Sequence, residues 1–530
     1  MKFELKTFKN PYSLLLLLFV ASFLVYLPGI EGRFTSDFYN WVRDYEHGTI
    51  SELWTCFGYP GLHHLYHIPF YFSYKVFGLN EMAWHIEFTF LHAFNAWLVY
   101  FLTKEFLEIL KKNNYFAYFT SFLFLLSPFQ TEAVAWGATI HYLFTLILFL
   151  SAFLYLIKYL KTKENKYLYL FHFLYILDLF TMELPLTFPA IFVLFTYATK
   201  NYYQVEIKTI AFKILLIHVL TLLGYFLLTK LIIGSYIGHY GAESHLTFDI
   251  TLASNALYDY YLKFLSFYRY ILPDSLKESL LKLFHNDGFK IISFSLISLT
   301  LLKNILFKQQ QKISALTLTL LNLVFFAISL LPVLNIEMNS LVFLTTDRYS
   351  YVASVFFFIA ISISLSFLPK KIGFIIAILY LLLNFVLLNK TVTIWKETGT
   401  LSKSIINSYT FYDQKVYALN NIAIHKGAYL FKNGFVAAIE LQKDRNIKES
   451  YQEIAKVYSA EMIDSVSIKQ IDQKITAELI QWGRWFALRD VDSLTYNAHL
   501  GYLNQTLIIE PKEKMNIIYL KAGKWQLLKN

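Results

Sequence analysis

The residues best suited to chemistry in this chain are a few carboxylates and one arginine, and Asp37 leads them. It stands in the segment 33–38, directly after the first long apolar run, residues 11–30. A run of this length crosses a hydrocarbon core about 30 Å thick, so the carboxylate emerges just outside that core. Asp37 is therefore a candidate active-site residue at a membrane surface.

Two further carboxylates stand beside the ends of apolar runs. Glu132 follows residues 115–131, and Glu183 stands where Pro185 interrupts a long apolar stretch. An exposed position at a helix end would explain Glu132 equally well. Glu183 has no long loop that would give it free access to water, so a role in the site is the stronger interpretation there.

The segment 344–351 combines an acid with an arginine. Arg348 could bind a phosphate through its planar fork of donors, with Asp347 as its partner or as a second ligand. The alternative is structural, because the same pair could anchor the start of the next helix.

Histidines raise two further alternatives. His85, His92 and Asn95 share one face of a predicted helix, where they either pack against other helices or line a groove for a lipid carrier. We favour packing. His63 and His67 have a spacing that could hold a metal on a helix, but packing among the nearby aromatic residues is favoured.

No cofactor is predicted. A divalent metal held by Asp37 and Asp347 is the alternative, and it is not favoured. The single cysteine, Cys56, excludes an internal disulfide and a cysteine-based metal cluster.

The elements that must position these residues are membrane helices. Of the 530 residues, 56% are hydrophobic, 19% aromatic and only 16% charged, which is too apolar for an ordinary soluble domain. The net charge of +10 is scattered in short lysine clusters between apolar runs, which indicates topology rather than nucleic-acid binding. We expect an all-α polytopic membrane protein with about eleven transmembrane helices. They fall near residues 11–30, 84–107, 115–131, 138–160, 167–182, 183–199, 208–233, 289–307, 314–334, 348–368 and 371–391.

Lysines predict the orientation of these helices. They precede the first helix and recur in alternate short loops, which makes the N-terminus and those loops cytoplasmic. They are Lys2, Lys6, Lys9, Lys104, Lys111, Lys112, Lys158, Lys161, Lys163, Lys166, Lys200, Lys208, Lys303, Lys308, Lys312, Lys370 and Lys371. The carboxylates named above collect on the opposite, exterior side. An odd helix count sends the C-terminal tail to that side as well.

Three regions outside the predicted spans carry further expectations. The first exterior loop contains a short interfacial helix near 68–77, and the long loop 234–288 contains Arg269 and an amphipathic stretch, residues 258–264. The polar tail forms a small α+β domain, so the chain divides into a catalytic domain, 1–391, and an exterior domain, 392–530. Within the tail we expect a turn at 427–435, a helix after it, and a hairpin of residues 516–520 and 524–528.

The order of these motifs resembles a known family. Asp37 after the first helix, residues 77–80 leading into His85 and His92, the segments 128–136 and 183–189, and residues 347–349 are similar to the GT-C class of polytopic glycosyltransferases. Within that class they most resemble bacterial relatives of the O-mannosyltransferase-like proteins that carry transmembrane helices and tetratricopeptide repeats. The resemblance covers about residues 10–400, and the tail shows no 34-residue repeat.

The resemblance implies a function. The donor would be a sugar, a hexose such as mannose, on a polyprenyl phosphate; the acceptor would be a protein or a glycan, and transfer would invert the anomeric centre. Asp37 would be the general base and Arg348 would stabilise the departing phosphate. Glu132, Glu183, Asp347, Arg269, His85 and His92 would bind the substrates. The protein would act in protein glycosylation at the cell envelope, in a bacterial inner membrane with the tail in the periplasm.

Two other functions stay open. A flippase or transporter for a lipid-linked glycan would need charges near the bilayer midplane and paired repeats, and the sequence shows neither. A polymerase or ligase of the O-antigen type would share the donor but usually depends on several arginines in a large exterior loop, where this chain has Arg269.

Overall fold

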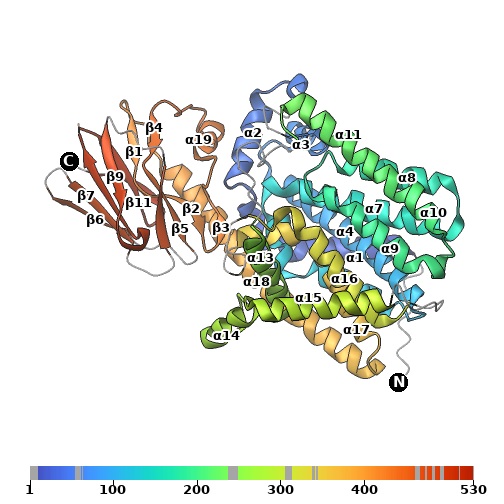
Figure 1. Cartoon of the computed structure of the whole chain (residues 1–530). Helices are drawn as coiled ribbons and strands as arrows, with labels where there is room; N and C mark the ends of the chain where they lie inside the picture. Colours follow the sequence, from blue (N-terminus) through green and yellow to red (C-terminus); the bar gives the residue numbers. More distant parts are fainter. Residues whose placement is uncertain are drawn as a thin grey trace.

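Helices fill the chain up to residue 408, and strands fill most of the tail (Figure 1). The computed structural model describes residues 10–53, 61–62, 64–236, 249–304, 313–336, 341, 344–459, 466–471, 474–479, 484–489, 495–512 and 514–528. Local sequence explains where many helices begin. Asn10 accepts a hydrogen bond from the backbone at the start of the first helix, which has a proline at its N-terminus, and Asn80 caps the long fourth helix in the same way.

The helical part has these elements in chain order: α1 (Pro11–Tyr26), η1 (Leu27–Arg33), α2 (Asp37–His47), α3 (His64–Phe77), α4 (Glu81–Ile109), α5 (Tyr115–Leu125), η3 (Pro128–Gln130), α6 (Thr131–Ala135), η4 (Gly137–Thr139), α7 (Ile140–Thr162), α8 (Asn165–Asp178), η5 (Leu184–Thr187), α9 (Phe188–Tyr203), α10 (Ile207–Thr209), η6 (Ile210–Leu215), α11 (Leu216–Ile233), α13 (Ile250–Ser266), α14 (Asp274–Phe284), α15 (Asp287–Leu302), α16 (Ala315–Leu330), η8 (Leu331–Val333), η9 (Leu344–Ser350), α17 (Ser354–Leu365) and α18 (Lys370–Ser408). Here η6 is a π-helical turn and the other η elements are 3₁₀ turns.

Several of these helices are long and apolar enough to cross a bilayer. In the described part of the chain there are five, or six if η9 and α17, which meet at 71°, form one broken span. The five are Pro11–Arg33, Gly137–Thr162, Ile207–Ile233, Ala315–Val333 and Lys370–Ser408. A helix lies in each of the predicted ranges, but eleven spans are not confirmed. Helices such as α8 and α9, with 14 and 16 residues, are shorter than the roughly 20 residues that a bilayer requires. The chain is an integral membrane protein.

The lysine-rich loops meet at one end of the bundle. Lys161 pairs with Glu108 at 3.1 Å, and Lys163 donates to the carbonyl of Tyr203 at 2.7 Å. Lys112 lies 3.8 Å from the centre of the Phe367 ring. These contacts join the ends of α4, α7, α9 and α17, so the alternate loops share a side as predicted. Lys2, Lys6, Lys9, Lys308 and Lys312 lie outside the described residues.

The last helix of the bundle continues into the tail. The helix α18 has 39 residues and runs without a break past residue 391, where the sequence predicted a domain boundary. It packs closely against η1, because Gly399 lies so near the backbone of Glu31 that a Cβ there would be 2.1 Å from the carbonyl oxygen. This close approach fixes the base of the tail to the end of the first membrane helix.

After α18, the described residues of the tail form three small sheets and the helix α19 (Phe435–Lys443). The sheets have the orders β12-β11-β1-β4, β6-β7-β10-β9 and β3-β2-β5-β8. The hairpin of β11 and β12 pairs Leu520 with Trp525, so this prediction is confirmed, as is the helix after residue 434. The strands are β1 (Val416–Ala418), β2 (Asn421–His425), β3 (Ala428–Tyr429), β4 (Tyr451–Glu453), β5 (Ala455–Ser459), β6 (Val466–Ile471), β7 (Lys474–Leu479), β8 (Arg484–Leu488), β9 (Tyr496–Leu500), β10 (Thr506–Pro511), β11 (Asn516–Lys521) and β12 (Lys524–Leu527), with a 3₁₀ turn, η10 (Tyr502–Asn504), after β9.

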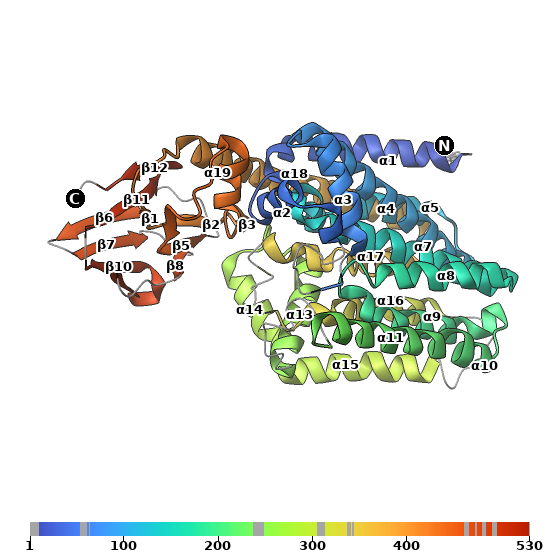
Figure 2. The same cartoon turned by 90° about the horizontal axis from the view of Figure 1, so that it is seen from above.

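The tail docks on the start of α2. Ser36 donates its backbone N–H to the carbonyl of Leu430 at 2.7 Å, and the backbone N–H of Asn433 donates to Ser36 Oγ at 3.3 Å. Figures 1 and 2 both show α19 beside α2 at this junction. The segment after the first helix and the tail therefore lie on the same side of the bundle, and the exterior location of that side stays a prediction.

Gly434 allows this docking, and its substitution should loosen it. Its φ is +81°, and an added Cβ would lie 2.2 Å from the Ser36 carbonyl oxygen. We expect Gly434→Ala to lower the free energy of unfolding by about 1–3 kcal/mol more than the control, because overpacking adds to the backbone strain. Gly78→Ala is the control, since Gly78 has φ +51° but nothing within 4 Å of an added Cβ. Thermal unfolding of both variants in detergent measures the difference, and equal losses would show that the docking tolerates the methyl group.

Candidate active site at the junction of bundle and tail

Asp37 is the first residue of α2 and is partly exposed. The positive end of the helix dipole favours a carboxylate at this position. Asn433, from the tail, donates its side-chain N–H to Asp37 Oδ1 at 2.6 Å. A carboxylate is thus held by a neutral donor at the end of the bundle that carries the tail, and it keeps access to solvent.

The backbone before Asp37 is strained. Ser36 has φ +49°, a left-handed value that a residue with a Cβ adopts at a cost of about 1–2 kcal/mol. The hydrogen bond from its N–H to Leu430, together with the contact from Asn433, holds it there. Such strain concentrates at functional sites, where the surrounding structure compels it.

Arg348 and Glu132 form a buried pair behind Asp37. Arg348 donates its backbone N–H to Glu132 Oε2 at 2.8 Å and its Nη1 to Oε1 at 2.5 Å. Burial raises the pKa of Glu132 to about 7, an effect that the positive charge of Arg348 opposes. Glu132 is fully buried, so the interpretation of an exposed end-of-helix residue is wrong.

Tyr429, on β3, lies near this pair. Its ring centre is 5.5 Å from the guanidinium carbon of Arg348 and 4.9 Å from the ring of Trp136. Burial raises the pKa of Tyr429, Arg348 opposes the rise, and the negative charges of Glu132 and Asp37 add to it. The charges of both carboxylates and of the arginine therefore influence the pKa of the same tyrosine.

The tail adds a second cation at this place. Lys432 Nζ lies 3.5 Å from the hydroxyl of Tyr429, to which it donates. Arg348 from the bundle and Lys432 from the tail thus both lie near the Tyr429 ring, 5.5 and 5.2 Å from its centre. Two cations beside a carboxylate can bind a phosphate and leave the carboxylate available as a base.

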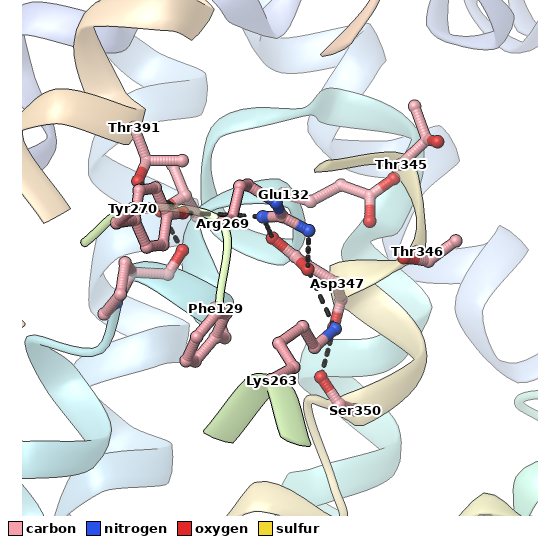
Figure 3. Close-up of polar contacts among 12 residues, drawn as sticks. Phe129, Glu132, Lys263, Arg269, Tyr270, Thr345, Thr346, Asp347, Ser350 and Thr391 are labelled. Carbon is pink, nitrogen blue, oxygen red and sulfur yellow. Dashed lines mark hydrogen bonds and ion pairs between the residues drawn. The ribbon is translucent and has the colours of Figure 1, made fainter. Parts of the chain in front are cut away.

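Asp347 belongs to a different cluster, shown in Figure 3. Arg269 donates to its two oxygens at 2.8 and 3.1 Å, and Lys263 donates to Oδ1 at 3.0 Å. The side chains of Asp347 and Lys263 are fully buried. Burial lowers the pKa of Lys263, and the charge of Asp347 opposes that change. The partners of Asp347 are thus Arg269 and Lys263, while Arg348 faces Glu132.

The histidines on α4 make contacts inside the bundle. His92 shares hydrogen bonds with the hydroxyl of Tyr351 at 2.8 Å and the carbonyl of Leu125 at 3.2 Å. His85 contacts the carbonyl of Phe23 at 3.0 Å. This geometry is that of helix packing, and their assignment to a substrate stays a prediction. Glu183 lies directly before η5, and its assignment also stays a prediction.

Comparison with solved structures gives a distant likeness. No family model matches this chain, and no curated protein matches it. Among solved structures it is similar to the archaeal oligosaccharyltransferase AglB from Archaeoglobus fulgidus, solved with an inhibitory peptide and a dolichol-phosphate. The TM-score is 0.37 at 11% sequence identity, over 82% of this chain and 64% of that one. This chain thus spans less than two thirds of that protein's length, and a TM-score of this size does not establish a common function.

The two metal alternatives that the sequence left open stay untested. In the part of the chain that the structure describes, no group of three or more histidine, cysteine or acidic side chains is placed to hold a metal. His67 Nδ1 contacts the hydroxyl of Tyr45 at 2.5 Å, and His63 lies outside the described residues. Asp37 and Asp347 have separate partners, Asn433 for the first and two cations for the second.

The sequence did not predict a role for three residues of these two clusters. Asn433 and Lys432 lie in the segment predicted only as a turn, and Lys263 lies in the stretch predicted only as an amphipathic helix. A lysine among aromatic and apolar residues, as in 258–264, was the available signal for Lys263, since a buried lysine needs an acidic partner. Asn433 carried no comparable signal, because its contact with Asp37 spans most of the chain.

Proposed function

We propose that this protein is a GT-C-type glycosyltransferase that moves a sugar from a polyprenyl-phosphate donor to an acceptor hydroxyl at the exterior face of the membrane. The observation that carries the proposal is the placement of Asp37: a partly exposed carboxylate at a helix N-terminus, held by Asn433 at 2.6 Å, at the end of the bundle opposite the lysine-rich loops. The order of sequence motifs, which resembles the GT-C class, supports the same reaction.

The proposed chemistry is a single displacement. Asp37 accepts the proton of the acceptor hydroxyl while the oxygen of that hydroxyl attacks the anomeric carbon. The bond between that carbon and the phosphate oxygen breaks, so the electron pair leaves with the phosphate and the anomeric centre inverts. Negative charge on the phosphate grows during this step, and Arg348, assisted by Lys432, stabilises it.

The substrates and setting follow from the resemblance. The donor sugar is a hexose such as mannose, and the acceptor is a protein or a glycan. We place the protein in a bacterial inner membrane, with the N-terminus in the cytoplasm and the tail in the periplasm. Glu132 orients Arg348, and the cluster of Asp347, Lys263 and Arg269 supports the η9 turn that carries it.

A donor panel tests the proposal. Purified protein in nanodiscs receives radiolabelled mannosyl, glucosyl and galactosyl polyprenyl phosphates with a peptide or glycan acceptor, with and without a chelator. We expect one donor to yield a labelled acceptor whose anomeric configuration is opposite to that of the donor, with equal yield in the chelator arm. Nanodiscs carrying an unrelated polytopic protein are the control. Retention of configuration would contradict the proposal. Movement of intact donor to the other leaflet without transfer, measured with the same protein in sealed proteoliposomes, would also contradict it.

A further inference from the structure

The tail reaches the proposed catalytic carboxylate directly. The segment 430–434 connects β3 to α19 and runs along residues 35–37. Asn433 Nδ2 donates to Asp37 Oδ1 at 2.6 Å, across 396 positions of sequence. A hydrogen bond to a charged acceptor is about twice as strong as one between neutral groups.

The segment that carries Asn433 is held by other residues of the tail. Arg489, after β8, donates Nη2 to the carbonyl of Lys432 at 3.0 Å and lies 3.4 Å from Asn433 Oδ1. Lys456, on β5, donates to the same carbonyl at 2.6 Å and pairs with Glu453 at 2.8 Å. The amide oxygen therefore faces the cation of Arg489, which directs the amide nitrogen toward Asp37.

We infer that Asn433 is a positioning residue for the general base, and that the tail is thereby part of the active site. This inference rests on the proposed function. By holding Oδ1, Asn433 fixes the rotation of the Asp37 carboxylate and leaves the second oxygen for the acceptor proton.

The first test is Asn433→Ala in the transfer assay. We expect kcat to fall about 10- to 100-fold, the effect of one charge-assisted hydrogen bond, with the KM for the donor within twofold of wild type. In the Asp37→Glu background, where the longer carboxylate no longer meets Asn433 in this geometry, the same substitution should cost less than threefold.

The near-isosteric Asn433→Asp keeps the shape of the loop. It replaces the donor amide with a second carboxylate beside Asp37, so the contact to Oδ1 is lost and like charges meet. We expect kcat to fall at least as far as in Asn433→Ala with the KM for the donor within twofold of wild type, a split that general loss of folded structure would not give. Asn497→Ala, on the exposed strand β9, is the control and should match wild type.

The outcomes separate this inference from the proposed function. Wild-type kcat in both Asn433 variants, with transfer still lost in Asp37→Asn, would overturn the inference alone. Transfer by wild type from no donor would overturn both. A drop in kcat that is equally large in the Asp37→Glu background would also overturn the inference, because Asn433 would then act independently of the carboxylate.

Discussion

Asp37→Asn should reduce sugar transfer by about 10²- to 10⁴-fold, the range for loss of a general base. The substitution keeps the size of the side chain and removes the acceptor for the proton of the attacking hydroxyl. Donor binding should stay within a few-fold of wild type, because the substitution leaves unchanged the two cations proposed to bind the donor phosphate. These cations are Arg348 and Lys432, near Tyr429. Initial rates with saturating donor, measured beside a donor-binding titration, check both parts.

Asp44→Asn is the matched control for this prediction. Asp44 lies on the same helix, α2, and pairs with Arg43 at 3.1 Å, with both side chains about a third exposed. An exposed pair of this kind contributes roughly 0–1 kcal/mol, so its loss should leave transfer near the wild-type rate. Equal rates for Asp37→Asn and wild type would show that Asp37 is not the general base.

Asp347→Asn should destabilise the protein by about 3–5 kcal/mol. The substitution leaves Lys263 and Arg269 without their shared counter-ion in a buried place, and an uncompensated buried charge is strongly unfavourable. The apparent midpoint of thermal unfolding in detergent should fall accordingly. Replacing Lys263 by Met in the same chain should recover part of the loss, since one of the two stranded charges is then gone.

The exposed pair of Asp274 and Lys277 provides the control for that prediction. The two groups lie 3.1 Å apart on α14, and the Asp274 side chain is 94% exposed. Asp274→Asn should change the unfolding midpoint by less than the error between preparations. If Asp347→Asn also left the unfolding midpoint unchanged, the cluster in Figure 3 would not stabilise η9.

The sequence predicted the positions of helices better than their roles. Apolar runs identify helices such as α7 and α16 because a bilayer requires long apolar segments. The same runs do not reveal that α8 and α9 are too short to cross a bilayer alone. An apolar run predicts that a helix is buried, but it does not distinguish burial in lipid from burial against other helices. The tail boundary was placed at residue 391 because the composition changes there, whereas the helix α18 continues to Ser408.

Pairing within the site depended on contacts that sequence does not encode locally. Asp347 and Arg348 are neighbours in sequence, yet successive side chains on a helical turn point in different directions, so each has its own partner. Asn433 shows the same limit more strongly, because only the docking of the tail brings it to Asp37. The carboxylates themselves were predictable, since polar groups at the ends of membrane helices are few.

The most direct test of the central claim is a single-turnover experiment. Wild-type and Asp37→Asn proteins in nanodiscs are loaded with the labelled donor identified by the panel, freed of excess donor and mixed with acceptor. The claim predicts that both proteins retain bound donor and that only wild type converts it to labelled acceptor and free polyprenyl phosphate. Conversion by Asp37→Asn at the wild-type rate would contradict it.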